Sequence, residues 1–233
     1  MGAPKLGCVL VLALDTATPA VTAGIVELTL DLVRPLATRV ARDARKHGEL
    51  LMPGVLAACA EAGITLGDIE AVVTGNGPGP FTGLRVGMVT AAALGDGLGV
   101  PVHGVCSLDA IAVQAAPGAG GPLLVVTDAR RREVYWAAYD PAGSRTCGPY
   151  VELPPRLADR LDELDPVAAA GSPEHVATLG LRVLTPAAPS PVGLVAVAAD
   201  ALRSGIVPGP LVPLYLRRPD AMEPGARKRV SAE

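Results

Sequence analysis

The order of the hydrophobic segments is the feature that most constrains how this chain can fold. Strand-like runs open the chain, and helical and strand-like runs then alternate. The strand-like runs are residues 8–14, 21–27, 30–40, 71–74 and 102–105, and the helical ones are 47–62, 82–98 and 107–115. Consecutive strands pair as hairpins, whereas strands joined through a helix lie parallel. This order therefore predicts an α/β fold with a mixed sheet.

The second half of the chain partly repeats this order after a Gly/Pro-rich stretch, 116–122, that we interpret as a hinge. Further strands are expected at 123–127, 133–139, 167–170 and 182–184, and further helices at 155–164 and 190–202. We therefore expect two lobes, an N-terminal one at 1–105 and a C-terminal one at 106–216. The helix near 190–204 should pack back on the first lobe, and 217–233 should be a disordered tail.

Composition narrows the classes of function. Half of the 233 residues are hydrophobic and 18% are charged, which excludes an intrinsically disordered chain. Twenty Lys and Arg against 23 Asp and Glu give a net charge of −3, so any contact with nucleic acid must come from a local patch or a partner. Aromatic residues, at 3%, are too few for a platform that stacks single-stranded bases. The four cysteines form no CxxC pair, which argues against a zinc cluster and fits a reduced chain.

The N-terminus allows two interpretations. Lys5 precedes the apolar run 6–14, and the small residues at 17–20 are similar to the cleavage region of a secretory signal. We favour a buried first strand, because the run is rich in Val and Leu and leads into a second strand-like stretch. Since no uncharged apolar run reaches about 18 residues, we expect no membrane span and a cytoplasmic protein.

Two loops carry residues suited to bind an anion. Gly77, Gly79 and Thr82 lie in a turn between a strand and a helix, where glycines allow close backbone approach and free helix amides can hold phosphate. Thr82 is expected to cap that helix. Asp15 and Thr16 follow the first strand and would orient a metal-bound phosphate. The alternatives are a tight turn without ligand and an Asx turn, and the spacing fits neither Walker A nor GxGxxG.

Other side chains give weaker signals. The three histidines, His47, His103 and His175, lie in separate stretches, so we expect no metal site. The run Arg130–Arg132 would either bind phosphate or form a solvated turn. The helices at 47–62 and 82–98 carry more apolar and small residues than one buried stripe needs. Packing within the domain and a protein–protein interface both fit that surplus.

Six stretches match a known family in order along almost the whole chain. They are residues 12–18, 47–53, 77–87, 101–108, 128–135 and 214–217. The most specific are GPGPFTGLR at 77–85 and Asp128-Ala129-Arg130 followed by Glu133-Val134-Tyr135. Together these stretches resemble the bacterial TsaB (YeaZ) family.

The resemblance implies an actin/Hsp70/sugar-kinase-like (ribonuclease H-like) α/β fold of two related lobes with mixed sheets. It implies a non-catalytic subunit that forms a heterodimer with the catalytic paralogue TsaD. With a TsaE-type ATPase, that pair would support N6-threonylcarbamoylation of adenosine 37 in tRNAs that read codons beginning with A. The chain would contact tRNA indirectly, through the complex, and would be able to form a homodimer without its partner. No cofactor is implied.

The resemblance also assigns roles to residues. Ser107 and Ile111 occupy the positions of two metal-binding histidines in the catalytic paralogue. Serine is a poor metal ligand and isoleucine is none, so no metal site and no catalytic residue are implied here. The implied partner interface lies on the two helices of the first lobe, at Leu50, Leu51, Val55, Ala58, Gly87, Ala91 and Leu94. Pro80 replaces the family's usual serine, which leaves at most a remnant of a phosphate site at Asp15, Thr16, Gly77, Gly79 and Thr82.

Two other functions stay open at this point. One is an enzyme, either a small phosphotransferase that uses Asp15 and the 77–85 turn or a metal-dependent, glycoprotease-like protein. The other is direct tRNA binding through Arg130–Arg132 or the basic segment 217–229, which should be weak and sensitive to salt because the net charge is −3.

Overall fold

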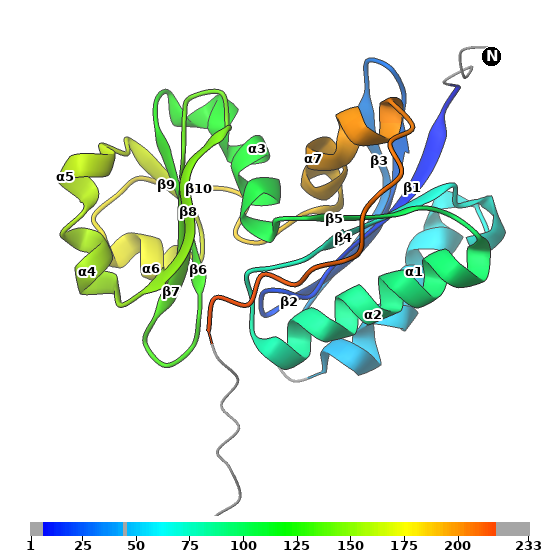
Figure 1. Ribbon diagram of the computed structural model, residues 1–233, viewed down its shortest axis with the longest axis horizontal. Helices are drawn as coiled ribbons and strands as arrows, with labels where there is room; N and C mark the ends of the chain where they lie inside the picture. The colour runs from blue at the N-terminus through cyan, green and yellow to red at the C-terminus, as the bar shows by residue number, and fades with distance from the viewer. Residues whose placement is uncertain (1–6, 44–45, 218–233) are drawn as a thin grey trace, which may run out of the picture.

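The computed structural model describes residues 7–43 and 46–217. Two five-stranded mixed sheets lie side by side, and helix α3 (Ser107–Ala119) leads from the first to the second (Figure 1). Helix α7 (Pro191–Arg203) returns to the first sheet and packs against α3, so the two helices separate the sheets. The molecule therefore has alternating layers of helices and sheets, as an α/β fold requires.

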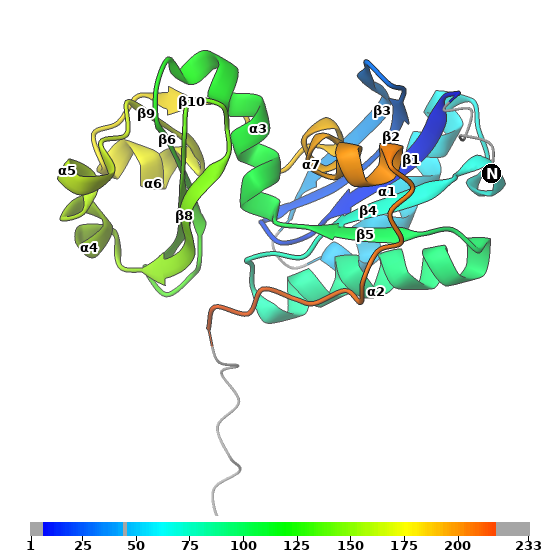
Figure 2. The ribbon, with the colours of Figure 1, turned by 45° about the horizontal axis from the view of Figure 1, so that its top comes forward.

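The first sheet has the order β3-β2-β1-β4-β5. Its strands are β1 (Val9–Asp15), β2 (Ala20–Leu28), β3 (Val33–Arg42), β4 (Ala71–Gly75) and β5 (Val102–Val105). The hairpin strands β2 and β3 are antiparallel to their neighbours, whereas β4 and β5 run parallel to β1. Helices α1 (His47–Ala62) and α2 (Phe81–Leu98) cover one face and α7 covers the other (Figure 2), while a short 3₁₀ turn, η1 (Leu66–Asp68), precedes β4.

The second sheet has the order β10-β9-β6-β7-β8. Its strands are β6 (Leu123–Asp128), β7 (Val134–Tyr139), β8 (Arg145–Glu152), β9 (Ala168–Gly171) and β10 (Val183–Leu184). Helix α3 covers its inner face, and short helices lie on its outer side: α4 (Pro154–Ala158), α5 (Leu161–Leu164) and α6 (Pro173–Thr178). Strand for strand, this sheet repeats the order and directions of the first. The predicted α/β fold of two related lobes is therefore confirmed.

Burial on both faces explains why the central strands read as continuous apolar runs. In β1, Leu12 and Leu14 pack under α1, whereas Val11 and Ala13 pack under α7, and all four are fully buried. The second sheet has the same arrangement, with Trp136 of β7 buried on its outer face.

The helix ends follow the expected chemistry with one exception. Gly63 ends α1 in the left-handed conformation, and the Ser190 hydroxyl caps α7 by accepting from the Gly193 amide at 3.0 Å. Thr82 does not cap α2. That helix begins at Phe81 after Pro80, and no side chain caps it.

Some sequence-based boundaries are wrong. The expected hinge at 116–122 is largely helical, because α3 continues to Ala119 with Ala115 and Ala116 buried against the second sheet. The helix expected at 155–164 is two short helices, α4 and α5, and both β8 and α6 were missed. The predicted disordered tail lies outside the described residues except for Arg217, which is half-buried and held by the second lobe. The boundary at residue 105 stays a prediction.

Across residues 7–43 and 46–217, no helix combines the length and the apolar character needed to cross a membrane.

Candidate functional site

A buried carboxylate lies at the centre of the first predicted anion site. Asp15 ends β1, and its side chain has no exposed surface. The Ser107 hydroxyl donates to Oδ2 at 2.6 Å, and the Ala17 amide donates to Oδ1 at 2.9 Å. Burial raises the pKa of Asp15 to about 6, although both hydrogen bonds act in the opposite direction. Gly75 must lack a side chain, since a Cβ there would overlap the Asp15 carboxylate.

Thr16 ties the β1–β2 turn to helix α2. Its hydroxyl donates to the Gly83 carbonyl at 2.7 Å and accepts from the Gly87 amide at 2.9 Å. On the α1 side of the same turn, His47 Nε2 lies 3.0 Å from the Thr18 carbonyl oxygen. These contacts use the hydroxyl and imidazole groups for packing within the chain.

The Gly/Pro-rich turn packs directly on the β1–β2 turn. Gly77 has φ +98°, and its carbonyl accepts from the Ser107 amide at 2.7 Å. Gly79 lies against the backbone of Ala17 so closely that a Cβ would clash with the Ala17 carbonyl. Thr82 lies exposed on α2. The structure thus brings Asp15, Thr16, Gly77 and Gly79 into one junction and leaves Thr82 at its edge.

The geometry of this junction fits the alternatives to an anion site, namely a tight turn without ligand at the glycine loop and an Asx turn at Asp15. The Ala17–Asp15 hydrogen bond is that of an Asx turn, and the Thr16 hydroxyl already has two partners. The Ser107 hydroxyl donates to Asp15, and Ile111 is fully buried in the core. In the described part of the chain, no three His, Cys, Asp or Glu side chains are placed to hold a metal ion.

The predicted partner interface needs correction residue by residue. Five of its members face the sheet and are buried in this chain, and two are half-buried. The buried ones are Leu51, Val55, Ala58, Gly87 and Ala91, and the half-buried ones are Leu50 and Leu94. Small residues on α2 serve contacts within the chain, since Gly87 receives the Thr16 hydroxyl and Gly95 lies against Val102 of β5. The buried five therefore support the helices rather than form a surface.

The outward side of the same two helices is apolar. Leu56 of α1 is 52% exposed and Val89 of α2 is 66% exposed. Ala92 and Ala93 of α2 are exposed as well, and Met52 and Val86 are half-buried. We call these six residues the outer surface of α1 and α2. Met52 and Val86 also pack partly against the core between these helices and the sheet, so Leu56 and Val89 are the large apolar side chains that this surface exposes most.

A segment without regular structure, the C-terminal strap (residues 206–217), runs from α7 past β5 to the second lobe (Figure 1). The Leu214 amide donates to the Asn76 carbonyl at 2.8 Å. The Tyr215 ring stacks on Phe81 of α2 with centroids 5.0 Å apart, and Arg85 Nε donates to its hydroxyl at 2.7 Å. The strap therefore connects both lobes.

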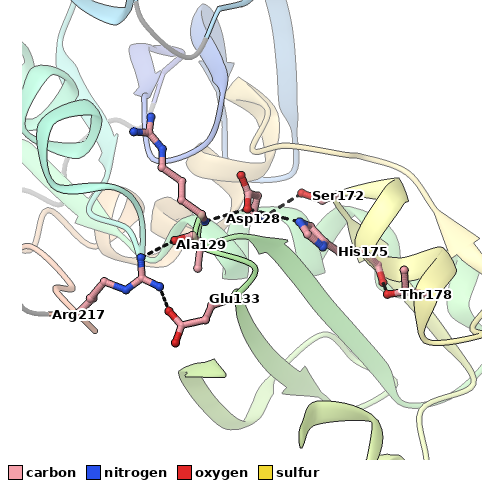
Figure 3. A network of polar contacts seen from close by, with 8 residues as sticks. Asp128, Ala129, Glu133, Ser172, His175, Thr178 and Arg217 are labelled. Carbon is pink, nitrogen blue, oxygen red and sulfur yellow. Dashed lines mark hydrogen bonds and ion pairs between the residues drawn. The ribbon is translucent and has the colours of Figure 1, made fainter. Parts of the chain in front are cut away.

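The strap ends at the turn between β6 and β7, where Figure 3 shows a network of polar contacts. Arg217 donates to the Ala129 carbonyl at 2.9 Å and forms an ion pair with Glu133. From α6, His175 Nε2 lies 3.4 Å from Asp128 Oδ1. Sequence reasoning marked the Asp-Ala-Arg stretch but missed its partners, because Arg217 and His175 are distant in sequence.

A cavity of about 520 Å³ lies beside β5, between α7 and the strap. Asn76, His103 and Arg145 are among its polar lining residues. His103 is buried, which lowers its pKa, and Asn76 Oδ1 has no hydrogen-bond partner among the described residues. No sequence pattern indicated this cavity, since its walls come from separate segments.

Comparisons with known proteins agree with this architecture. The family model of TsaD, described as tRNA N6-adenosine threonylcarbamoyltransferase, matches residues 39–179, more than half of the chain. The structure of YeaZ from Pseudomonas aeruginosa superposes with a TM-score of 0.71 over 89% of this chain and 100% of that one, at 26% identity. The chain belongs to the TsaB/YeaZ group of this family.

Relatives of this TsaB/YeaZ member fall into two sets. A protein of Mycobacterium tuberculosis described as uncharacterized is 58% identical over 91% of this chain and 93% of its own length. The TsaB protein of Escherichia coli, described as a tRNA threonylcarbamoyladenosine biosynthesis protein, is 36% identical over 55% of this chain. The chain spans about half the length of that curated TsaB protein, 54%.

Proposed function

We propose that this chain takes part in the biosynthesis of tRNA N6-threonylcarbamoyladenosine as an accessory subunit that binds a catalytic paralogue of the TsaD type. Membership of the TsaB/YeaZ group supports the role in biosynthesis. In this proposal the pair acts in the cytoplasm with a TsaE-type ATPase on adenosine 37 of tRNAs that read codons beginning with A. The observation that carries the pairing is the exposed apolar outer surface of α1 and α2.

A subunit without its own transferase activity is consistent with the residues around Asp15. Ser107 and Ile111 stand where the family resemblance expects metal-binding histidines, and both are engaged inside this chain. A phosphotransferase that uses Asp15 and Thr16 receives no support from their contacts, because each polar group already has a partner within the fold.

The outer surface suits a helix-to-helix contact with another protein. Leu56 and Val89 would each bury a large apolar side chain, worth about 1.5 to 3 kcal/mol when fully removed from water. The alanines at 92 and 93 would let a partner helix approach closely. We infer that the paralogue covers this surface, with Leu50 and Leu94 at its margins.

Co-expression with the TsaD paralogue tests the pairing. Leu56→Glu and Val89→Glu should each abolish co-elution, because a partner would bury an unpaired charge, while the chain itself stays folded. Leu30→Glu is the matched control, since Leu30 is 59% exposed in the turn between β2 and β3. Co-elution that survives both helix substitutions would refute this interface.

The biosynthetic role has a separate readout. Depleting the chain in its host should remove threonylcarbamoyladenosine from nucleoside digests of tRNA. Unchanged levels would refute the role, whatever the pull-down shows.

A further inference from the structure

Two segments of the chain join the lobes in the helical layer between the sheets. Helix α3 leads from β5 into β6, and residues 185–190 return from β10 to α7. The two helices pack closely there, since a Cβ on Gly193 of α7 would clash with the Ala110 carbonyl of α3. Both connections lie in this one layer (Figure 1), so it is the pivot about which one lobe can turn against the other.

The C-terminal strap is a further connection, and it crosses between the lobes away from this pivot. Figures 1 and 2 both show its last part passing below α3, beside the start of α2. The cavity of about 520 Å³ lies between α7 and the strap, and its walls come from both lobes, with His103 from β5 and Arg145 from β8. Close-packed interiors resist movement, whereas this hollow leaves room for the angle between the lobes to change.

The first lobe holds the strap at the start of α2. The Tyr215 ring stacks on Phe81, and Arg85 both donates to the Tyr215 hydroxyl at 2.7 Å and places its guanidinium carbon 3.7 Å from the centre of the Phe81 ring. Leu211 packs against Leu84 of the same helix. Stacking, a hydrogen bond and a cation–π contact therefore fix one end of the strap.

The second lobe holds the other end. Leu216 packs against the core between α3 and the second sheet, and Arg217 donates to the Ala129 carbonyl at 2.9 Å and pairs with Glu133 (Figure 3). Within the described structure, residues 207–212 take part in no backbone hydrogen bond. The hold of the strap on the two lobes therefore depends on the side chains near its end.

These contacts join three of the stretches that carry the family resemblance. The start of α2 belongs to residues 77–87, the turn that receives the strap belongs to 128–135, and the strap itself supplies 214–217. The three stretches are far apart in the sequence and belong to different lobes. A connection between the lobes gives them one common physical role.

We propose that the strap is a latch that sets the angle between the two lobes, closed when Tyr215 and Arg217 are both in place. The Arg217 and Glu133 side chains keep 23% and 31% of their surface exposed, so water and salt ions compete for this pair. The second-lobe end is therefore the one that opens first, and the second lobe then turns about α3. This latch does not depend on the proposed function in tRNA modification.

Spin labels on either side of the latch measure its opening. Thr82 is exposed on α2 next to Phe81, and Arg156 is exposed on α4. Helix α4 follows Glu152, which pairs with Val134 directly after the turn that receives the strap. Labels at Thr82→Cys and Arg156→Cys therefore lie near the two ends of the latch, and pulsed electron spin resonance gives the distribution of distances between them.

The labelled chain carries Cys8→Ser and Cys147→Ser, because the other two native cysteines are buried. This parent should give one narrow distribution at low salt. Arg217→Ala and Tyr215→Ala should each move the mean to a longer distance and broaden the distribution. Raising the salt from about 50 mM to about 1 M should move the parent in the same direction and should leave Arg217→Ala unchanged, since that variant has no ion pair to screen.

Two controls separate the latch from general effects of substitution. Val212→Ala shortens an exposed side chain in the middle of the strap, and Arg34→Gln breaks an ion pair with Glu27 inside the first lobe. Both should keep the distribution of the parent. Tyr215→Phe retains the stacking and should keep it as well, which provides a second test of this end if Tyr215→Ala does not fold.

Urea unfolding of each labelled variant distinguishes an open latch from a loss of stability. A lower urea midpoint with an unchanged distribution in Arg217→Ala would overturn the proposal, because a contact that only stabilises the fold gives that result. A control that moves the mean as far as Arg217→Ala, or a salt effect of equal size in Arg217→Ala and the parent, would overturn it too.

Discussion

Replacing Asp15 by Asn tests whether a buried carboxylate destabilises this fold at neutral pH. Burial raises its pKa from 3.8 to about 6, so the folded chain keeps a proton that the unfolded chain releases. One pKa unit corresponds to about 1.4 kcal/mol, so the ionised group costs the folded state about 3 kcal/mol above pH 6. Asn has the same shape and no charge, and the Ser107 hydroxyl can rotate to accept from its amide. Asp15→Asn should therefore raise the free energy of unfolding at pH 7.5 by up to about 3 kcal/mol.

The sign of the pH dependence follows from the direction of the shift. Because the folded pKa lies above the unfolded one, the contribution of the protonated carboxyl is fully present below about pH 4 and is lost as the pH rises through 6. Roughly half of it should be lost between pH 5 and 7.5, and this part should vanish in Asp15→Asn.

Urea unfolding of the wild type and of Asp15→Asn at pH 5, 6 and 7.5 measures this difference. The histidines are the same in both proteins, so their contribution to the pH dependence cancels in the comparison. Asp31→Asn, at an exposed turn, is the control and should keep the pH dependence of the wild type. An Asp15→Asn protein with that same pH dependence and no gain at pH 7.5 would refute the reasoning.

Four further substitutions test the packing. Thr16→Val should lower the free energy of unfolding by about 1 to 2 kcal/mol, since it removes the hydrogen bonds of the Thr16 hydroxyl to the Gly83 carbonyl and the Gly87 amide, and an unchanged urea midpoint would contradict this. Tyr215→Phe keeps the stacking of the strap but loses the bond from Arg85, so it should cost no more than about 1 kcal/mol; a larger loss would mean that the strap holds the lobes mainly through this contact. Leu51→Ala should lower the free energy of unfolding by about 2 to 5 kcal/mol, because it leaves a cavity. Leu56→Ala should change it by less than about 0.5 kcal/mol, since this side chain is half exposed. Equal losses would show that the orientation of α1 is wrong.

The accuracy of the sequence-based elements depended on how strongly each segment is buried. The central strands and α1 were predicted almost to the residue because apolar runs and a Gly C-cap mark them. Strand β8 was missed because it is an edge strand, half-buried, with Gly148 and Pro149 inside it. Helix α3 continues through Pro117 because its last turn is buried against the second sheet, and packing there outweighs local preference.

The candidate site also combines features that the local sequence predicts with contacts that only packing decides. Sequence reasoning chose Asp15, Thr16 and the glycine turn, and the structure does bring Asp15, Thr16, Gly77 and Gly79 together. It could not foresee that their polar groups would be satisfied within the chain, because Ser107 and α2 approach from distant positions. Of the residues that it assigned to a partner interface, most face inward, since periodicity marks an apolar stripe without saying what covers it, and the interface itself stays a prediction.

By itself, the sequence determined the alternation of strands and helices and the family, because these depend on residue identity and local spacing. Only the tertiary structure decided which apolar side chains of the two helices stay exposed and which carboxylate is buried. Those outcomes depend on contacts between residues far apart in the chain, for which local pattern carries no information.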